Sequence, residues 1–373
     1  MNKKLHIICL NIPYPVDYGG AFDIFYKLPA LQQQGVKIHL HCFQYGRPKQ
    51  HELKQYCESV NYYKRKTGLC GLSFRYPYIV SSRSSKNLLN KLIEDDYPIL
   101  MEGVHCTYLL NDKRFKQRMC FVRLHNVEYI YYKGLYKNTS SLFKKMYFYC
   151  ESKVLVPYER CIAKKVAFWS VTEKDAETYK KIGCKRSHFL PVFLPEWKVK
   201  AIEGNGTFCL YHGDLSVTEN EKVVIWLIMH VFNDLQIPFV IAGKKPSLRI
   251  CKLLRNKNTT YLIANPKEQD MQDLISKAHI NIIPSYNSTG VKLKLINALF
   301  NGRHCLVNEL TVEGTNLNEI CHVAGDADAF KSKIIQLHAQ PFTKEESNVR
   351  RVILHKMFNN DVNAKQVVKW IWG

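Results

Sequence analysis

The sequence predicts an α/β protein with two doubly wound, Rossmann-like domains. Short apolar runs alternate with helix-length amphipathic segments along both halves of the chain, a pattern typical of parallel sheets covered by crossover helices. Each half also opens on an apolar run that ends at a glycine turn, Leu5–Ile12 before Gly19-Gly20 and the run from Thr207 before Gly213. The 373 residues, 46% of them apolar, are enough for two or three packed domains.

The boundary between the two domains is predicted from composition. Residues 198–206 are polar and carry two glycines, Gly204 and Gly206, so they are interpreted as a linker. This places an amino-terminal domain at residues 1–197 and a carboxyl-terminal domain at residues 207–358. No internal repeat or low-complexity segment interrupts either domain.

The positive charge is concentrated in the first half of the chain. The net charge is +22; residues 1–200 hold 34 Lys and Arg against 16 Asp and Glu, a net of +18, and residues 201–373 hold 20 against 16, a net of +4. A basic surface suits nucleic acid, anionic lipid or an acidic substrate. No nucleic-acid-binding signature accompanies the charge, and the segment 129–165 mixes Lys with Tyr and Phe. An anionic membrane surface is therefore the predicted partner. The alternative, given equal weight, is that segment 129–165 forms packed helices whose lysines only face solvent.

The sequence also predicts a cytoplasmic protein, one that can lie peripherally on the inner face of the membrane. The longest apolar run, residues 223–232, is far shorter than the roughly 20 residues of a membrane span. The segment from Met1 to Leu10 favours a first strand over a signal peptide. Thirteen cysteines without a Cys-x-x-Cys pair argue against a zinc motif and a disulfide framework.

Residues 282–302 form the segment around which the prediction is organised. An apolar run, a polar loop ending in Thr289-Gly290 and a helix-forming run stopped by Gly302 predict a strand, a turn and a helix. At about 100° per residue, Gly290, Lys294, Asn297 and Asn301 share one stripe of that helix. A glycine helix start with a lysine one turn in favours an anion such as phosphate. The alternative is a buried helix whose lysine only reaches solvent.

The run Thr-Gly-x-x-x-Lys-x-x-Asn-Ala-x-x-x-Gly, which starts at Thr289, resembles the donor-binding segment of family 4 glycosyltransferases of the GT-B type. Gly290 and Lys294 match a variant of that segment that reads Gly-x-x-x-Lys-x-x-Glu-Ala. Thr289 and Asn297 replace the two glutamates of the family's Glu-x7-Glu motif, which contact the donor sugar and the ribose in relatives. The resemblance implies that Lys294 and the amides of Gly290 and Val291 hold the donor diphosphate.

Four other segments resemble the same family, two in the amino-terminal domain and two further along the chain. Gly19-Gly20 resembles the first loop of the amino-terminal domain, which reaches the donor phosphates, although an ordinary tight turn is the alternative. A helix is predicted to follow this loop, from Ala21 to Gln34. His125 lies at the end of a predicted strand, in the sequence Arg-x-His-Asn-x-Glu, and resembles the histidine that lies beside the donor sugar in relatives. The alternative is a structural histidine.

Gly213 with Asn220 resembles the family's phosphate loop in the carboxyl-terminal domain. The commoner form has arginine directly after the glycine, and here that position is Asp214. The cation for the phosphate would then come from Lys222 or Lys294. Residues 359–373 resemble the last helix of the fold, which crosses back to the amino-terminal domain.

The resemblance implies a GT-B fold with the active site in a cleft between the two domains. It implies a retaining glycosyltransferase that moves a hexose-type sugar from a nucleotide-diphosphate sugar to a glycan or lipid-linked acceptor, in surface polysaccharide or glycan biosynthesis. No metal and no cofactor are expected. Asp326-x-Asp328 precedes a predicted helix and is interpreted as a helix cap rather than a metal motif. Thr172, which follows a predicted strand at residues 166–171, is likewise interpreted as a helix cap. The alternative function is a non-catalytic GT-B sugar-binding or partner subunit, since both motif glutamates are missing; a nucleotide-sugar epimerase fits the carboxyl-terminal segments less well.

Overall fold

A computed structural model describes residues 3–17, 19–139, 141–255 and 257–373. The chain forms two compact units. Unit 1 comprises Met1–Pro195 with Phe358–Gly373, and unit 2 comprises Glu196–Met357. The segment predicted as a linker, residues 198–206, lies inside unit 2, because Lys200 N donates to Phe300 O (2.7 Å) and Gly204 N to Phe342 O (2.9 Å).

Unit 1 is built on a seven-stranded parallel sheet with the order β3-β2-β1-β4-β5-β6-β7. The apolar residues of β1 and β4 are buried on both faces, which is why these strands are nearly continuous apolar runs in the sequence. The strands are β1 (Lys3–Cys9), β2 (Val36–Gln44), β3 (Ser59–Lys64), β4 (Ile99–Glu102), β5 (Cys120–Leu124), β6 (Ala167–Ser170) and β7 (Ser187–Phe189).

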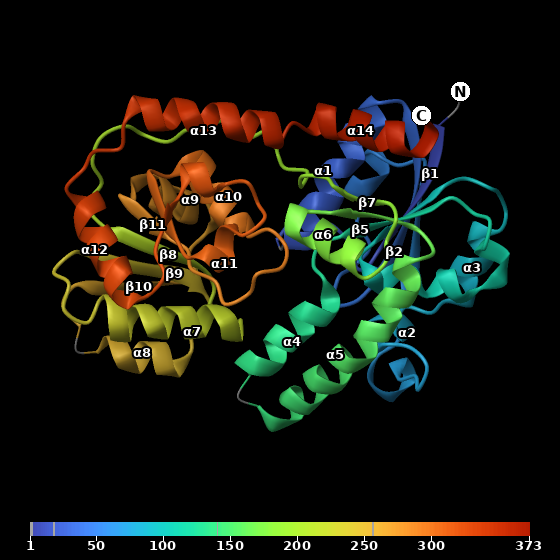
Figure 1. Cartoon of the computed structure of the whole chain (residues 1–373), viewed down its shortest axis with the longest axis horizontal. Coiled ribbons are helices and arrows are strands. Elements are labelled where there is room, and N and C mark those ends of the chain that lie inside the picture. The colour runs from blue at the N-terminus through green and yellow to red at the C-terminus, as the bar shows by residue number, and fades with distance from the viewer. Residues whose placement is uncertain (1–2, 18, 140, 256) are drawn as a thin grey trace. The chain divides into compact units, whose positions relative to one another are not determined.

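Seven α-helices are described in unit 1. They are α1 (Gly19–Gln33), α2 (Tyr78–Ser81), α3 (Lys86–Leu92), α4 (Glu128–Asn138), α5 (Leu142–Ala163), α6 (Glu173–Lys181) and α14 (Asn360–Trp372). The last of these, α14, packs beside α1 although their sequences are more than 300 residues apart (Figure 1). Trp370 of α14 lies over Trp169 of β6 with ring centroids 5.3 Å apart, and this contact ties the end of the chain to the unit 1 core.

Unit 2 is built on a six-stranded parallel sheet with the order β10-β9-β8-β11-β12-β13. Its strands are β8 (Cys209–Asp214), β9 (Phe239–Lys244), β10 (Thr260–Ala264), β11 (Ile280–Ile282), β12 (His304–Val307) and β13 (His322–Val323). Its described α-helices are α7 (Thr218–Trp226), α8 (Leu248–Leu254), α9 (Glu268–Lys277), α10 (Leu293–Asn301), α11 (Glu309–Val312), α12 (Ala327–His338) and α13 (Lys344–Met357). The predicted fold class, α/β with two doubly wound domains, is confirmed.

In each sheet the strand order reverses direction at one point. In unit 1 this point lies between β1 and β4, and in unit 2 it lies between β8 and β11. Loops that leave neighbouring strands on opposite sides open a crevice at the carboxyl ends of the strands, where ligands bind in open α/β sheets. The topology therefore indicates one ligand-binding edge in each unit.

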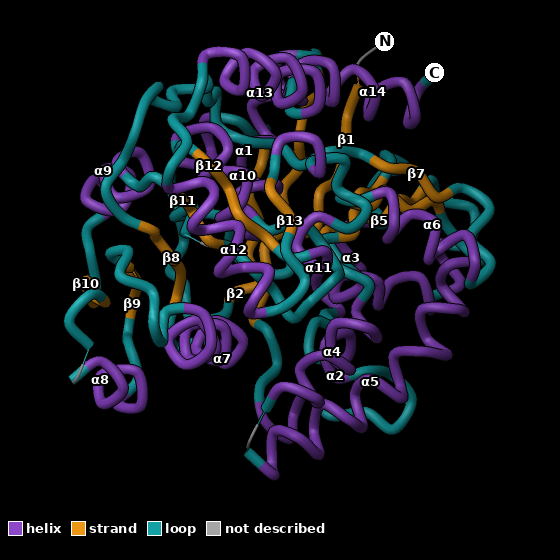
Figure 2. Tube along the Cα trace, turned by 60° about the vertical axis from the view of Figure 1, so that its left-hand side comes forward, coloured by secondary structure: helices purple, strands orange, loops and turns teal. Residues whose placement is uncertain are grey.

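The helices α4 and α5 lie side by side in both views of the molecule (Figures 1 and 2). The first turns of α5 expose large apolar side chains: Leu142 is 81% exposed, Phe143 85% and Met146 65%. Lys144 and Lys145 are exposed between them. Among the described helices, none is both long and apolar enough to cross a membrane.

Two predicted helix caps are confirmed. The Thr172 side chain accepts a hydrogen bond from Asp175 N (3.1 Å) at the start of α6. The Asp326 side chain accepts one from Ala329 N (2.9 Å) at the start of α12, as the capping interpretation of the Asp-x-Asp sequence requires.

Two predicted helix starts are wrong. Gly19 and Gly20 form the first turn of α1 instead of a loop, so the helix starts before the predicted Ala21. Helix α10 starts at Leu293 rather than at Gly290, because Gly290 has a φ of +66° that a right-handed helix cannot contain. The loop between β11 and α10 is correspondingly longer than predicted.

Candidate functional site

The ammonium group of Lys294 lies at the carboxyl edge of the unit 2 sheet. Lys294 is in the first turn of α10, and its Nζ donates to the Tyr211 hydroxyl (3.1 Å) and to Asn220 Oδ1 (3.1 Å). The same Nζ lies 4.7 Å from the centre of the Tyr211 ring. Because Tyr211 belongs to β8, next to the reversal point of the sheet, the cation is placed where this fold class binds ligands.

The electrostatic surroundings of Lys294 suit an anion. Burial lowers its pKa to about 8, and the neighbouring Glu219 carboxylate opposes that shift. The ammonium form therefore still predominates at neutral pH. Both of its hydrogen-bond partners are neutral oxygens, and an ammonium has three N–H donors. The positive charge is therefore held in place without a carboxylate bonded to it.

Asn220 connects this lysine to the turn that follows β8. Its Nδ2 donates to Asp214 O (2.9 Å), and its Oδ1 also accepts from the Tyr211 hydroxyl (3.0 Å). A Cβ atom at Gly213 would make only an ordinary contact with Asn220 Nδ2 (3.4 Å), but the φ of +156° there favours glycine. The structure thus brings three of the predicted donor-binding residues together: Gly213, Asn220 and Lys294.

The loop after β11 is fixed by a carboxylate that the sequence did not single out. Glu219 Oε1 accepts from Ser285 Oγ (2.6 Å) and from Tyr286 N (3.0 Å), which holds this loop against α7. Asn308 adds a second restraint through Ser285 N (3.0 Å). A pocket of about 270 Å³ lies beside this loop, and its lining residues are Val223, Trp226, Pro284, Ser285, Tyr286, Asn308, Gly325, Asp326, Ala327 and Phe330.

Thr289, Gly290 and Val291 lie before α10 and not in its first turn, which corrects the predicted geometry. Thr289 is buried, and both its N and its Oγ1 donate to Asn287 Oδ1 (3.0 Å each). Lys292 Nζ donates to Thr289 O (2.7 Å). The amides of Gly290 and Val291 consequently belong to the bend and loop before the helix, not to a helix N-terminus.

The two remaining donor-binding predictions in unit 2 fall at different places. Asn297 lies one turn after Lys294 on α10, and its Oδ1 accepts from Asn301 Nδ2 (2.7 Å). Lys222 is two positions after Asn220 on α7, which turns it about 200° around the helix axis. Of the two predicted cation sources, the structure therefore places Lys294 with Gly213 and Asn220.

In unit 1, His125 joins a buried group of charged side chains. His125 Nε2 lies 3.1 Å from Glu102 Oε2, at the end of β4, and Nδ1 lies 3.9 Å from Asp23 Oδ2 on α1. Lys27 Nζ donates to Glu102 Oε1 (2.7 Å) and to Asp23 Oδ2 (3.0 Å), so it bridges the two carboxylates. Arg123 of β5 binds both oxygens of Asp23, through Nη2 (2.8 Å) and Nε (2.9 Å).

The charges of this group balance. Burial raises the pKa of Asp23, but Arg123 and Lys27 outweigh burial and hold the pKa well below its usual range. Burial likewise raises the pKa of Glu102, and Lys27 with His125 brings it below its usual value. Asp23, Glu102 and His125 are close enough together to ligate a metal ion, yet Lys27 and Arg123 already neutralise both carboxylates. The arrangement instead fixes the orientation of the His125 ring.

Gly19 and Gly20, predicted as a donor-binding loop, start α1 in the same unit. Asp23 and Lys27 follow them on that helix, so the first three turns of α1 carry two members of the group that orients His125. Tyr18 lies outside the described residues.

Sequence reasoning missed the residues that position Lys294 and His125. These residues are Tyr211, Glu219, Asp23, Lys27, Glu102 and Arg123. One signal was available: Asp23 and Lys27 are four positions apart in a predicted helix, a spacing that forms ion pairs. The other contacts join residues far apart in the sequence, where no local pattern reports them.

Comparisons with known proteins support the resemblance. Residues 207–340 match the family of glycosyl transferases group 1. An uncharacterized 44.6 kDa protein in the cps region of Klebsiella pneumoniae is 27% identical over 394 residues, with 99% of each chain covered.

Solved structures similar to this chain extend the likeness to the whole fold. Sucrose-phosphate synthase from Thermosynechococcus elongatus has a TM-score of 0.70 at 13% identity, with 99% of this chain and 98% of that chain covered. A TarM mutant of S. aureus, in complex with fondaparinux, α-GlcNAc-glycerol and UDP, has a TM-score of 0.65 at 10% identity, with 100% of each chain covered. Anabaena HepE, in complex with UDP and glucose, has a TM-score of 0.61 at 9% identity and 98% coverage of both chains.

Proposed function

We propose that this chain, a GT-B glycosyltransferase of the group 1, family 4 type, transfers a sugar from a nucleotide-diphosphate sugar to a glycan or lipid-linked acceptor. The family match in unit 2 and the full-length structural neighbours support the type. The donor class, a hexose-type sugar and a retaining outcome follow the resemblance. The cps-region relative supports a role in surface polysaccharide biosynthesis.

The single observation that carries the proposal is the placement of Lys294. Its ammonium lies between Tyr211 and Asn220 at the reversal point of the unit 2 sheet, with neutral hydrogen-bond partners. Negative charge develops on the leaving diphosphate as the bond between the sugar and the diphosphate of the donor breaks. A cation already fixed at that place stabilises the transition state without reorganisation, and such electrostatic stabilisation is usually what lowers the barrier most in enzymes.

We assign His125 the contact with the donor sugar. Glu102 and Asp23 hold its ring from two sides, so the imidazole keeps one orientation while a sugar hydroxyl or a developing charge approaches. The carboxylates of the buried group around it are neutralised by cations of the same group. His125, whose side chain is 15% exposed, is the member that can contact solvent and a ligand. No step of this proposal uses a metal ion or a cofactor.

Nucleotide release tests the activity. The full chain is first screened by thermal shift with UDP, GDP, ADP, CDP and dTDP, which identifies the base without knowledge of the sugar. The corresponding nucleotide sugars are then incubated with the protein, and released nucleotide is measured with and without candidate acceptors. We expect stabilisation by one nucleotide diphosphate and slow donor hydrolysis that an acceptor accelerates.

The same measurements separate the enzyme from a non-catalytic GT-B subunit. A sugar-binding or partner subunit would be stabilised by a nucleotide or sugar but would release no nucleotide above the level of the Lys294→Ala variant. Equal release by the parent and by this variant, across all donors that bind, contradicts the proposal.

We propose further that the start of α5 meets an anionic membrane that carries a lipid-linked acceptor. Leu142, Phe143 and Met146 are exposed apolar side chains, and Lys144 and Lys145 lie between them on the most basic part of the chain. Apolar and aromatic groups settle at the headgroup level, and each lysine near an anionic surface contributes about 1 kcal/mol.

Vesicle sedimentation tests this surface. The full chain should sediment with anionic vesicles at low salt and be released at about 1 M salt, where the Debye length falls to about 3 Å. Phe143→Ser with Met146→Ser should reduce binding. The matched control is Leu248→Ser with Val352→Ser, which removes two exposed apolar side chains from unit 2. Binding that the control pair reduces equally, or that neutral vesicles support equally, contradicts the assignment to α5.

A further inference from the structure

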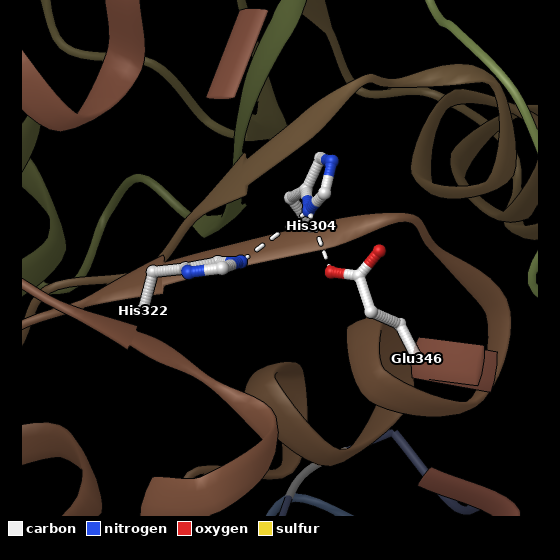
Figure 3. Close-up of side chains that lie close together, drawn as sticks. All are labelled: His304, His322 and Glu346. Carbon is white, nitrogen blue, oxygen red and sulfur yellow. Dashed lines mark hydrogen bonds and ion pairs between the residues drawn. The ribbon is translucent and has the colours of Figure 1, made fainter. Parts of the chain in front are cut away.

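Three potential metal ligands converge in unit 2, away from the edge that holds Lys294. His304 starts β12, His322 starts β13 and Glu346 lies in the first turn of α13 (Figure 3). His304 Nδ1 lies 3.3 Å from His322 Nε2 and 3.4 Å from Glu346 Oε1. All three ligand atoms lie within 4.8 Å of one another.

Two of the three separations between the ligand atoms fit a tetrahedral transition-metal site, and the third is within 4.8 Å. Zinc binds histidine nitrogen and carboxylate oxygen at about 2.0–2.1 Å, and a tetrahedron of that size separates its ligand atoms by about 3.3–3.4 Å. Both separations measured from His304 Nδ1 have that length. Two imidazoles and one carboxylate also form a ligand set that zinc uses with a water in the fourth position.

Proton positions explain why a cation suits this place. His304 Nε2 faces Gln340 O at 3.2 Å, so it must carry the hydrogen that this carbonyl accepts. In the neutral ring, Nδ1 then carries no hydrogen and is an acceptor. It faces Glu346 Oε1, which is also an acceptor. A proton from His322 Nε2 satisfies His304 Nδ1 but not the carboxylate. A metal ion satisfies all three atoms together.

The three ligand side chains are also oriented and deprotonated before a metal binds. Glu346 Oε2 accepts from Thr343 N (2.8 Å) in the cap of α13, which leaves Oε1 directed at His304. Burial lowers the pKa of His304, and burial with the neighbouring His304 lowers the pKa of His322 to about 4, so both rings are neutral at pH 7. Arg350 contributes to both shifts from one turn further along α13, where its guanidinium donates to Gly302 O (2.8 Å).

We propose that His304, His322 and Glu346 bind one divalent transition metal, zinc in the first instance, with water as the fourth ligand. The ion would link β12, the edge strand β13 and α13 within unit 2. His304 lies at the amino end of β12, the opposite end from the edge where Lys294 lies, so the site is separate from the proposed donor site. The inference therefore stands independently of the glycosyl-transfer proposal.

Metal titration of the full chain tests the site. Chelator-treated protein is titrated with Zn²⁺ by calorimetry and with Co²⁺ by visible absorption, which reports a four-coordinate geometry directly. We expect one zinc per chain with a Kd below about 10 μM, a Co²⁺ spectrum of a tetrahedral site and a higher thermal midpoint with zinc. Loss of His304 could also disturb its bond to Gln340, so the informative variants are His322→Gln and Glu346→Gln.

These two variants should weaken zinc binding at least tenfold, since even indirect supporting groups change metal affinity by about 10–100-fold. The control is His355→Gln, which removes an exposed histidine from the same helix as Glu346. Donor binding and nucleotide release by the variants should match the parent. No stoichiometric zinc binding, an octahedral Co²⁺ spectrum, or equal weakening by His355→Gln would overturn the site in favour of an imidazole–carboxylate pair.

Discussion

The two units place polar side chains at the same kind of sheet edge but balance their charges differently. In unit 1, Lys27 and Arg123 neutralise Asp23 and Glu102, and the group leaves a positioned histidine. In unit 2, the cation Lys294 is held by two neutral oxygens. A balanced buried group serves to orient a side chain, whereas a positioned and unbalanced charge serves to bind an ion of the opposite sign. The difference supports the proposed division of roles, with the sugar contact in unit 1 and the diphosphate contact in unit 2.

The balance in unit 1 is tested by removing one of its cations. Lys27→Met removes the ammonium that bridges Glu102 and Asp23, and breaking a buried ion pair in this way typically costs about 3–5 kcal/mol. We expect a loss of that size in the free energy of unfolding, measured with urea. The matched control is Lys365→Met, which breaks the exposed Lys365–Asp361 pair on α14 and should change stability by less than about 1 kcal/mol.

A second variant separates lost charge from lost packing. If charge imbalance is the cause, Lys27→Met combined with Glu102→Gln should be more stable than Lys27→Met alone, because both members of the pair are then neutral. A double variant no more stable than the single variant would show that the lysine stem, and not its charge, supports unit 1.

The opposite result is expected in unit 2, where the lysine serves the ligand more than the fold. Lys294→Ala leaves the Tyr211 hydroxyl and Asn220 Oδ1 bonded to each other (3.0 Å), so no buried donor or acceptor is stranded. We expect little change in thermal midpoint and a loss of about 1.5–3 kcal/mol in transition-state stabilisation, or roughly ten- to hundredfold in kcat/KM. Lys277→Ala, which removes an exposed lysine of the same unit, is the control. Unchanged turnover and donor affinity in Lys294→Ala would contradict the assignment.

The two regions also show which parts of the fold are readable in sequence. The parallel sheets were predictable because buried strands appear as apolar runs. The Thr172 and Asp326 caps were predictable because a cap acts over only three residues. The start of α10 was not predicted correctly, since the positive φ at Gly290 reflects how the whole loop packs. The α1 start failed for the opposite reason: two adjacent glycines suggested a turn, yet they adopt helix once Asp23 and Lys27 anchor the following turns.

Candidate ligands were predictable only one at a time. Gly213, Asn220 and Lys294 could each be picked out by resemblance, but Asn220 and Lys294 are 74 positions apart and their contact depends on the packing of α7 and α10 at one sheet edge. Lys27 and Glu102 are 75 positions apart, and no residue between them signals the pair. The same holds for His304, His322 and Glu346, whose spacing matches no metal-binding motif.

The lowered pKa of Lys294 predicts a pH dependence for the proposed diphosphate site of unit 2. In the proposed site the diphosphate binds the ammonium form, and the pKa of Lys294 in the free protein is about 8, so affinity should fall as the pH rises above 8. A bound anion raises the pKa of the lysine, so kcat should persist to higher pH than kcat/KM. Dissociation constants measured from pH 7.5 to 9.5 check this. Lys294→Arg keeps its charge throughout that range and should remove the fall; an equal fall in the arginine variant would assign it to another group.

The smallest expected effect concerns Asn297, one turn after Lys294 on the same helix. Its Oδ1 already accepts from Asn301 Nδ2 (2.7 Å), so the position can hold an acceptor in one orientation. Asn297→Glu would keep that bond and add a second, charged acceptor able to receive both hydroxyls of a ribose. We expect nucleotide affinity to change by about 0.5–1.5 kcal/mol, or two- to tenfold, with a matching change in preference between ribose and deoxyribose nucleotides. Asn297→Gln supplies the same length without the charge. If the glutamate and glutamine variants bind every nucleotide diphosphate as the parent does, Asn297 does not face the ribose, and the donor contact at this end of α10 is limited to Lys294.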